Sequence, residues 1–105
     1  MTQTSAWQPE HCAESLKALG DPIRLRIIEH LRTGPLNVGE LASALDTTTV
    51  TVSHHLGILY HAGFVRRAKR GRFVDYSLEK KVFVRSSRGA EHIDLHCCRL
   101  ELPRG

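Results

Sequence analysis

The sequence has no apolar run that approaches the ~18 residues needed for a membrane-spanning helix. Its start, residues 1–10, also lacks the basic and then apolar layout of a secretory signal. These two absences lead us to expect a cytoplasmic protein. We find no internal repeat, no glycine-rich phosphate loop, no nucleophile elbow and no pair of carboxylates at catalytic spacing, so the sequence does not indicate an enzyme.

Cysteine is scarce, with three residues in 105. Because this number is small and odd, we do not expect a disulfide framework, and free thiols that react or bind a metal are the open alternatives. Apolar residues make up 41% of the chain and charged residues 25%, which is ordinary for a folded globular protein. The length predicts a single domain, since two cores would each be close to the lower size limit for folding.

Positive charge is concentrated in one segment. The chain carries 15 Lys and Arg against 11 Asp and Glu, a net charge of +4. Residues 66–81 alone hold seven basic residues against two acids, namely Arg66, Arg67, Lys69, Arg70, Arg72, Lys80 and Lys81 against Asp75 and Glu79. This segment has the charge pattern of a polyanion-binding surface, although a solvated hairpin would also fit.

Hydrophobic periodicity predicts helices over the first 62 residues. The first runs from Glu10 to Leu19, with Cys12, Leu16 and Leu19 as its apolar positions, and stops at Gly20. Three more helices follow, with caps at Asp21, Asn37 and Thr48 and ends near Gly34, Asp46 and Ala62. Val52, Leu56 and Leu59 line the inner face of the last helix, whereas Thr49, Ser53 and His54 point elsewhere.

After Gly63 the apolar residues recur at every second position, the period of a β-strand. Residues 64–69 and 72–78 predict a β-hairpin with a tight turn at Arg70-Gly71. Farther on, residues 82–84 resemble a strand and residues 86–89 a loop. Ile93, Leu95 and Cys97 alternate, which favours an extended segment.

Two short helices joined by a polar turn and followed by a basic hairpin form a winged helix-turn-helix layout, mainly α with a β-hairpin wing. We expect a flexible segment over residues 1–9, the winged domain over 10–79, and a tail over 80–105 for dimerisation and sensing. Small polar side chains let a helix approach base edges in the major groove, and hairpin Arg and Lys neutralise phosphates. A polar solvent face on the fourth helix is the alternative reading, and the basic hairpin favours DNA.

Three motifs in order resemble the ArsR/SmtB family of metalloregulatory repressors. They are Ala18–Ile28, then Thr51–Leu59 with His61–Val65, and finally Arg70-Gly71-Arg72 with Tyr76. The resemblance spans about Leu16 to Leu78. It implies a homodimeric repressor that binds operator DNA and is released by a ligand.

The same resemblance suggests which residues contact DNA. The candidates are Thr48, Thr49, Val50, Ser53, His54 and His55 on the fourth helix, and Lys69, Arg70 and Arg72 on the hairpin. Val50 replaces a common Ser and would contact a thymine methyl group. His55 is either a base reader or a structural residue, and we rank it below His54.

The inducer is not identified by the sequence. The family's thiol pair at the start of the third helix is missing from residues 36–41, and Asp94-Leu95-His96 copies half of a second family site. Candidate ligands concentrate in the tail and on the first helix, namely Cys97, Cys98, Cys12, His96, Asp94, His92 and His11. Zinc, copper(I), arsenite and thiol oxidation are the open signals.

Another class of function also fits the sequence. The chain could be a winged-helix module that binds an acidic protein, or a thiol-based redox or metal-handling protein without specific DNA binding. A stable protein complex without DNA affinity at low salt would favour that alternative.

Overall fold

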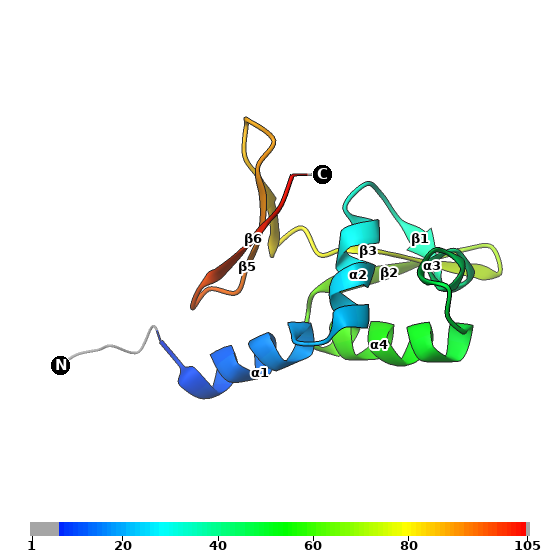
Figure 1. The fold of residues 1–105 in the computed structure, drawn as a ribbon, viewed down its shortest axis with the longest axis horizontal. Helices are drawn as coiled ribbons and strands as arrows, with labels where there is room; N and C mark the ends of the chain where they lie inside the picture. The colour runs from blue at the N-terminus through cyan, green and yellow to red at the C-terminus, as the bar shows by residue number, and fades with distance from the viewer. Residues whose placement is uncertain (1–6, 105) are drawn as a thin grey trace.

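The computed structural model describes residues 7–104, which form four helices and six strands (Figure 1). The helices are α1 (Pro9–Leu19), α2 (Pro22–Leu31), α3 (Val38–Leu45) and α4 (Thr49–His61). The strands are β1 (Leu36–Asn37), β2 (Val65–Arg70), β3 (Phe73–Leu78), β4 (Phe83–Arg85), β5 (Glu91–Asp94) and β6 (Arg99–Leu102). Of the segment expected to be flexible, residues 1–6 lie outside the described residues, and Pro9 already opens α1.

Side-chain caps start three of the helices, as the sequence predicts. The Asp21 carboxylate accepts hydrogen bonds from the backbone N–H groups of the first turn of α2. Asn37 and Glu40 form a reciprocal capping box at α3, with distances of 2.8 and 2.9 Å. Thr48 caps α4 by accepting from the Thr51 N–H at 3.1 Å. Each cap satisfies donors that a helix cannot pair internally, so these boundaries are encoded locally.

The core lies between the helices and the first sheet. Val52, Leu56 and Leu59 of α4 are fully buried, which confirms the predicted inner face of that helix. They pack in one cluster with apolar side chains of α2 and α3. Along α1 the predicted apolar stripe is buried only at its C-terminal end, because Leu19 is 4% exposed while Leu16 is 49% exposed.

The first sheet has the order β1-β3-β2, and all neighbours are antiparallel. Arg70 pairs with Phe73, so the two-residue turn is Gly71-Arg72 and not Arg70-Gly71 as the sequence suggested. Gly71 has φ 64°, a conformation that favours glycine, and it takes the first central position of the turn. This preference moves the turn by one residue.

The tail forms a second sheet, with the order β4-β5-β6 (Figure 1). The extended segment expected over Ile93, Leu95 and Cys97 is confirmed only as far as Asp94, because a turn closed by the Leu95 N–H and the Cys98 carbonyl follows β5. The expected strand at residues 82–84 lies at Phe83–Arg85. Ile93 is fully buried and Leu95 is 4% exposed, and both join the core cluster of the helices. No helix in the described part of the chain has the length and apolar character to cross a bilayer.

Two links between distant residues fasten the tail to the helices. The buried Glu91 carboxylate of β5 accepts from Arg32 Nε at 2.7 Å and from Arg85 Nε at 2.5 Å. The hydrogen bond from Arg32, aided by Arg85, holds the pKa of Glu91 below its usual value. The second link is a disulfide between Cys12 and Cys97, which are 85 positions apart. The sequence led us to expect free thiols, and the fold overturns this for two of the three cysteines because it brings α1 against the tail.

Candidate nucleic-acid interface and thiol cluster

The outer face of α4 presents a compact set of small side chains at its N-terminal half. Thr49, Val50, Ser53 and His54 are all exposed, and Val50 is 78% exposed. Asp46, in the left-handed conformation at the end of α3, sets the turn that leads into α4. A helix with short side chains on an exposed face can bring its backbone close to base edges. The sequence-predicted reading positions therefore share one accessible surface.

Thr48 and His55 hold α4 in place through hydrogen bonds. The Thr48 hydroxyl is engaged as the N-cap of α4. His55 is partly buried, and its Nδ1 accepts from Arg24 Nη1 at 3.0 Å. Burial lowers the pKa of His55, and the positive charge of Arg24 acts in the same direction. A neutral imidazole that joins α2 to α4 matches the structural reading of His55 better than base recognition.

The basic hairpin divides into paired and accessible cations. Arg70 forms a two-point hydrogen bond with the Asp75 carboxylate, at 2.6 and 3.1 Å, which lowers the pKa of Asp75. The Arg67 guanidinium lies 3.9 Å from the centre of the Tyr60 ring. Lys69 and Arg72 are exposed, and no ion pair of the described chain involves either of them. Arg66 is also exposed and outside these ion pairs, but it pairs with Ser77 away from the turn, so Arg72 and Lys69 are the unpaired cations nearest the hairpin turn.

Position supports a joint surface for helix and hairpin. The N-terminal end of α4 and the β2–β3 turn lie at the same end of the molecule in Figure 1, and the tail sheet lies towards the other end. A groove of about 700 Å³ lies between α1 and α4, and His54 of α4 and Arg24 of α2 are among its lining residues. His11 lines the same groove from α1.

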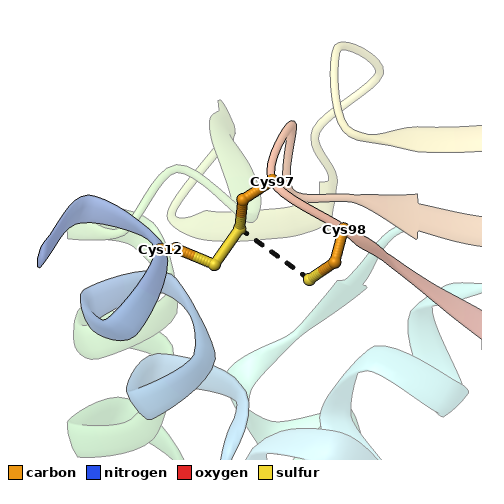
Figure 2. A group of neighbouring side chains, drawn as sticks. All are labelled: Cys12, Cys97 and Cys98. Carbon is orange, nitrogen blue, oxygen red and sulfur yellow. Dashed lines mark hydrogen bonds between the residues drawn. A yellow bond between two sulfur atoms is a disulfide. The ribbon is translucent and has the colours of Figure 1, made fainter. Parts of the chain in front are cut away.

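The three cysteines form a cluster although they come from opposite ends of the chain (Figure 2). Cys12 and Cys97 are joined, and the exposed Cys98 has its Sγ 3.8 Å from that of Cys97. All three sulfur atoms lie within 4.8 Å of one another. The sequence named all three cysteines as candidate ligands, and it did not predict the bond between Cys12 and Cys97.

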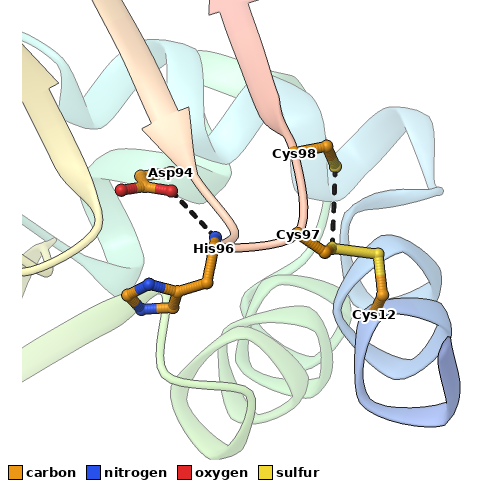
Figure 3. Close-up of a disulfide and its surroundings, with 5 residues drawn as sticks. All are labelled: Cys12, Asp94, His96, Cys97 and Cys98. Atoms are coloured by element: carbon orange, nitrogen blue, oxygen red, sulfur yellow. Dashed lines mark hydrogen bonds between the residues drawn. A yellow bond between two sulfur atoms is a disulfide. The ribbon is translucent and has the colours of Figure 1, made fainter. Parts of the chain in front are cut away.

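The other tail candidates lie outside this cluster. The His96 backbone N–H donates to the Asp94 carboxylate at 2.8 Å, and the His96 ring points away from the sulfur atoms (Figure 3). His92 sits in β5, opposite Glu101 of β6. Within the described residues, no His, Asp or Glu joins the three sulfur atoms in a metal-sized group. The fold thus separates the thiols from the predicted oxygen and nitrogen donors.

The sequence did not predict the side chains that orient His55, Arg70 and Arg67. Arg24 lies between the C-terminal end of α1 and His55, because its Nε also donates to the Ala18 carbonyl at 2.6 Å. Asp75 restrains Arg70, and Tyr60 covers Arg67. The Asp75 pairing has a local signal, since an acid opposes the basic strand across the hairpin. The other two contacts join separate elements and have none.

Comparison with known proteins gives consistent matches. Residues 21–67 match the family model described as "Bacterial regulatory protein, arsR family". The HTH-type transcriptional regulator NmtR of Mycobacterium tuberculosis is 44% identical over 66 residues, which are 63% of this chain and 55% of that protein. The transcriptional repressor SdpR of Bacillus subtilis is 35% identical over 66 residues, 63% of this chain and 73% of SdpR.

A solved structure extends the similarity to the fold. The homodimeric winged helix-turn-helix DNA-binding domain of Mb0332 from Mycobacterium bovis superposes with a TM-score of 0.68 and 26% identity. The match covers 77% of this chain and 75% of that one. The chain thus spans about half the length of NmtR and about three quarters of SdpR. The family model ends within β2 and does not include the tail.

Proposed function

The chain belongs to the arsR family of bacterial regulatory proteins, and from this premise we propose that it is a transcriptional repressor that binds operator DNA as a homodimer. The observation that carries the proposal is the exposed row Thr49, Val50, Ser53 and His54 on α4, at the same end of the molecule as the basic hairpin turn. In this proposal the protein binds DNA in the cytoplasm and catalyses no reaction.

The two parts of the surface have different roles. In the proposed complex, α4 enters the major groove, where His54 and Ser53 can hydrogen-bond with base edges and Val50 can contact a thymine methyl group. Arg72 and Lys69 at the hairpin neutralise backbone phosphates beside it. Arg70 is held by Asp75, so its contribution to phosphate binding requires that this pair opens. His55 and Thr48 position α4 and do not read sequence.

A homodimer suits this arrangement for two reasons. A single α4 can contact only a few base pairs, and two copies related by a twofold axis read two half-sites one helical turn apart. The solved Mb0332 domain, with the same fold, is homodimeric. We expect the operator to contain two related half-sites for this reason.

Thiol chemistry supports a ligand-released repressor. Three sulfur atoms within 4.8 Å fit a soft ion, since thiolates are its preferred ligands. The Cys12–Cys97 disulfide leaves a single thiol, so zinc, copper(I) or arsenite would require its reduction. Cys12, Cys97 and Cys98 would hold such an ion, and oxidation of the same thiols is the other signal. His92, Asp94, His96 and His11 lie apart and would not complete its coordination.

Titration of the protein against a duplex from upstream of its own gene tests the proposal. We expect tight binding that weakens with salt, and at least ~1,000-fold weaker binding to a scrambled duplex. Arg72→Ala should weaken binding to both duplexes and reduce the salt slope by about one, and His54→Ala should mainly reduce discrimination between them. Equal affinity for both duplexes in the unmodified protein would contradict a specific repressor. A stable complex with an acidic protein in the absence of DNA binding would favour the interaction module.

A further inference from the structure

The turn between β5 and β6 places two neighbouring cysteines on the same side of the chain. Adjacent residues of a strand point to opposite faces. Here the backbone leaves the strand conformation, with His96 at φ 70° and the Leu95 N–H donating to the Cys98 carbonyl at 2.9 Å. Cys97 and Cys98 therefore both face Cys12 of α1 (Figure 2). This turn is what allows a third sulfur to lie beside the disulfide.

The three sulfur atoms differ in accessibility. Cys12 and Cys97 are only partly exposed and are joined to each other, whereas Cys98 is exposed and free. Thiol–disulfide exchange requires a thiolate that can reach a disulfide sulfur, and its rate depends on access. Cys98 meets the access requirement on both sides, because it is exposed to solvent and its Sγ lies within 4.8 Å of both Cys12 Sγ and Cys97 Sγ.

We propose that Cys98 is the exchange thiol through which the Cys12–Cys97 disulfide is made and opened. The disulfide and Cys98 together form a latch between α1 and the tail sheet. In this scheme the partly buried pair holds the latch closed, and the exposed thiol exchanges electrons with small disulfides or dithiols in solution. Disulfides of cytoplasmic proteins are mostly transient and redox-sensing, which agrees with a latch of this kind.

The closing reaction proceeds in three exchange steps when the oxidant is oxidised glutathione. The Cys98 thiolate attacks one glutathione sulfur, forms a mixed disulfide and releases glutathione thiolate. The Cys12 thiolate then attacks Cys98 Sγ, forms Cys12–Cys98 and releases the second glutathione. Finally the Cys97 thiolate attacks Cys12 Sγ and returns Cys98 as a thiolate. In total two cysteine thiols are oxidised and one glutathione disulfide is reduced to two thiols, and a dithiol reductant reverses the sequence.

Opening or closing the latch can affect α4, the helix proposed to read DNA. Cys12 lies on α1, which packs against α4 and lines the same groove as His54. A closed latch restrains α1 from the tail side, and an open latch leaves α1 held by its helix contacts alone. We therefore expect oxidised and reduced protein to differ in DNA affinity. This consequence rests on the proposed function, and the exchange role of Cys98 does not.

Oxidation kinetics test the exchange role directly. Reduced full-length protein is mixed with oxidised glutathione, quenched with an alkylating agent, and its disulfides are mapped by mass spectrometry. We expect Cys98→Ser to reach the same Cys12–Cys97 product roughly tenfold more slowly than the unmodified protein. His92→Ala, which lies in β5 outside the turn and keeps all three thiols, should retain the unmodified rate. Equal rates for Cys98→Ser and the unmodified protein would overturn the proposal.

Single-thiol variants provide a second measurement that does not depend on the latch. In three proteins that each keep one cysteine and carry Ser at the other two positions, the Cys98 protein should form the mixed disulfide with glutathione fastest. Faster reaction at Cys12 or Cys97 would show that the entry thiol is not Cys98. Circular dichroism of each variant establishes that the chains compared are folded.

DNA titration separates the regulatory consequence from the proposed function. Oxidised and reduced unmodified protein are titrated against the upstream duplex, with Cys12→Ser as a protein that cannot close the latch. We expect at least a threefold difference in affinity between the two states and no difference for Cys12→Ser. Binding that is equal in both states would overturn the regulatory role alone. Absence of specific binding in both states would overturn the repressor proposal and leave the glutathione rates to decide the role of Cys98.

Discussion

The winged-helix body, residues 9–78, and the tail, residues 79–104, share apolar packing, but the tail is also held by an ion-pair group and a disulfide. In the body, every helix contributes side chains to one shared apolar cluster. The tail contributes Ile93 and Leu95 to that cluster and packs the partly buried Val82, Phe83 and Leu102 against it. In addition, the Arg32–Glu91–Arg85 group and the Cys12–Cys97 disulfide fasten the tail to the helices. Apolar burial is insensitive to pH and redox state, whereas ion pairs respond to pH and disulfides respond to redox state. The comparison therefore identifies the tail as the part of the molecule that solution conditions can loosen.

The largest loss in the free energy of unfolding is expected from removal of a buried apolar side chain, because apolar burial holds both the tail and the body. Ile93→Ala removes a fully buried side chain of β5 and should lower the free energy of unfolding by about 2–5 kcal/mol. Leu56→Ala in α4 is the matched change in the body and should fall in the same range. Urea unfolding followed by circular dichroism measures both. A separate early transition for Ile93→Ala, with the main midpoint unchanged, would show that the tail unfolds independently of the body.

The disulfide should contribute almost as much to the free energy of unfolding as the buried Ile93 side chain. It closes a loop between positions 85 apart, so its loss should lower the free energy of unfolding by about 2–4 kcal/mol. Urea unfolding with and without a dithiol reductant measures this difference. Cys12→Ser should show the reduced stability in both conditions, and Cys98→Ser should behave as the unmodified protein. An unmodified protein with the same midpoint in both conditions would contradict a stabilising link.

A smaller effect is expected at the ion pairs of the tail. Glu91→Gln should lower the free energy of unfolding by about 1–2 kcal/mol at pH 7, because two arginines lose their carboxylate partner. Glu29→Gln is the control, since it removes an exposed partner of the same Arg32. It should lower the free energy of unfolding by no more than about 0.5 kcal/mol.

The Glu91 contribution should also depend on pH in a defined direction. The folded protein lowers the pKa of Glu91, so the stabilisation is fully present above the pKa of the unfolded carboxyl group. It is lost as the pH falls through the lower pKa of the folded state. The unmodified protein and Glu91→Gln should therefore converge in stability in acid, and a constant difference down to pH 2 would contradict this role.

The smallest effect is expected at a local feature of the body. Thr48→Ala removes the side-chain cap of α4 and should cost about 1 kcal/mol. Thr49→Ala, one residue later on the exposed face, removes no cap and serves as the control. Amide hydrogen exchange in the first turn of α4 should increase for Thr48→Ala alone. Equal exchange in both variants would show that the Thr48 cap does not limit fraying.

Local signals explain which parts of the fold could be predicted. Asp21 before Pro22, Asn37 before Glu40 and Thr48 each mark a helix start because their side chains bond to N–H groups within three residues. The hairpin was expected at the correct place and its turn was displaced by one residue. The DNA-contact residues were proposed from the family resemblance, and their roles remain predictions. The fold places Thr49, Val50, Ser53 and His54 on one exposed face.

The sequence by itself determined the helices, the basic hairpin and the family, because caps, hydrophobic periods and motifs act over a few residues. The tertiary structure alone decided that Glu91 meets Arg32, that His55 meets Arg24, and that Cys12 joins Cys97 beside a free Cys98. These partners are 59, 31 and 85 positions apart, and no local pattern selects one partner among the many residues at such distances. Their meeting depends on how the tail packs against the helices, which is a property of the whole core.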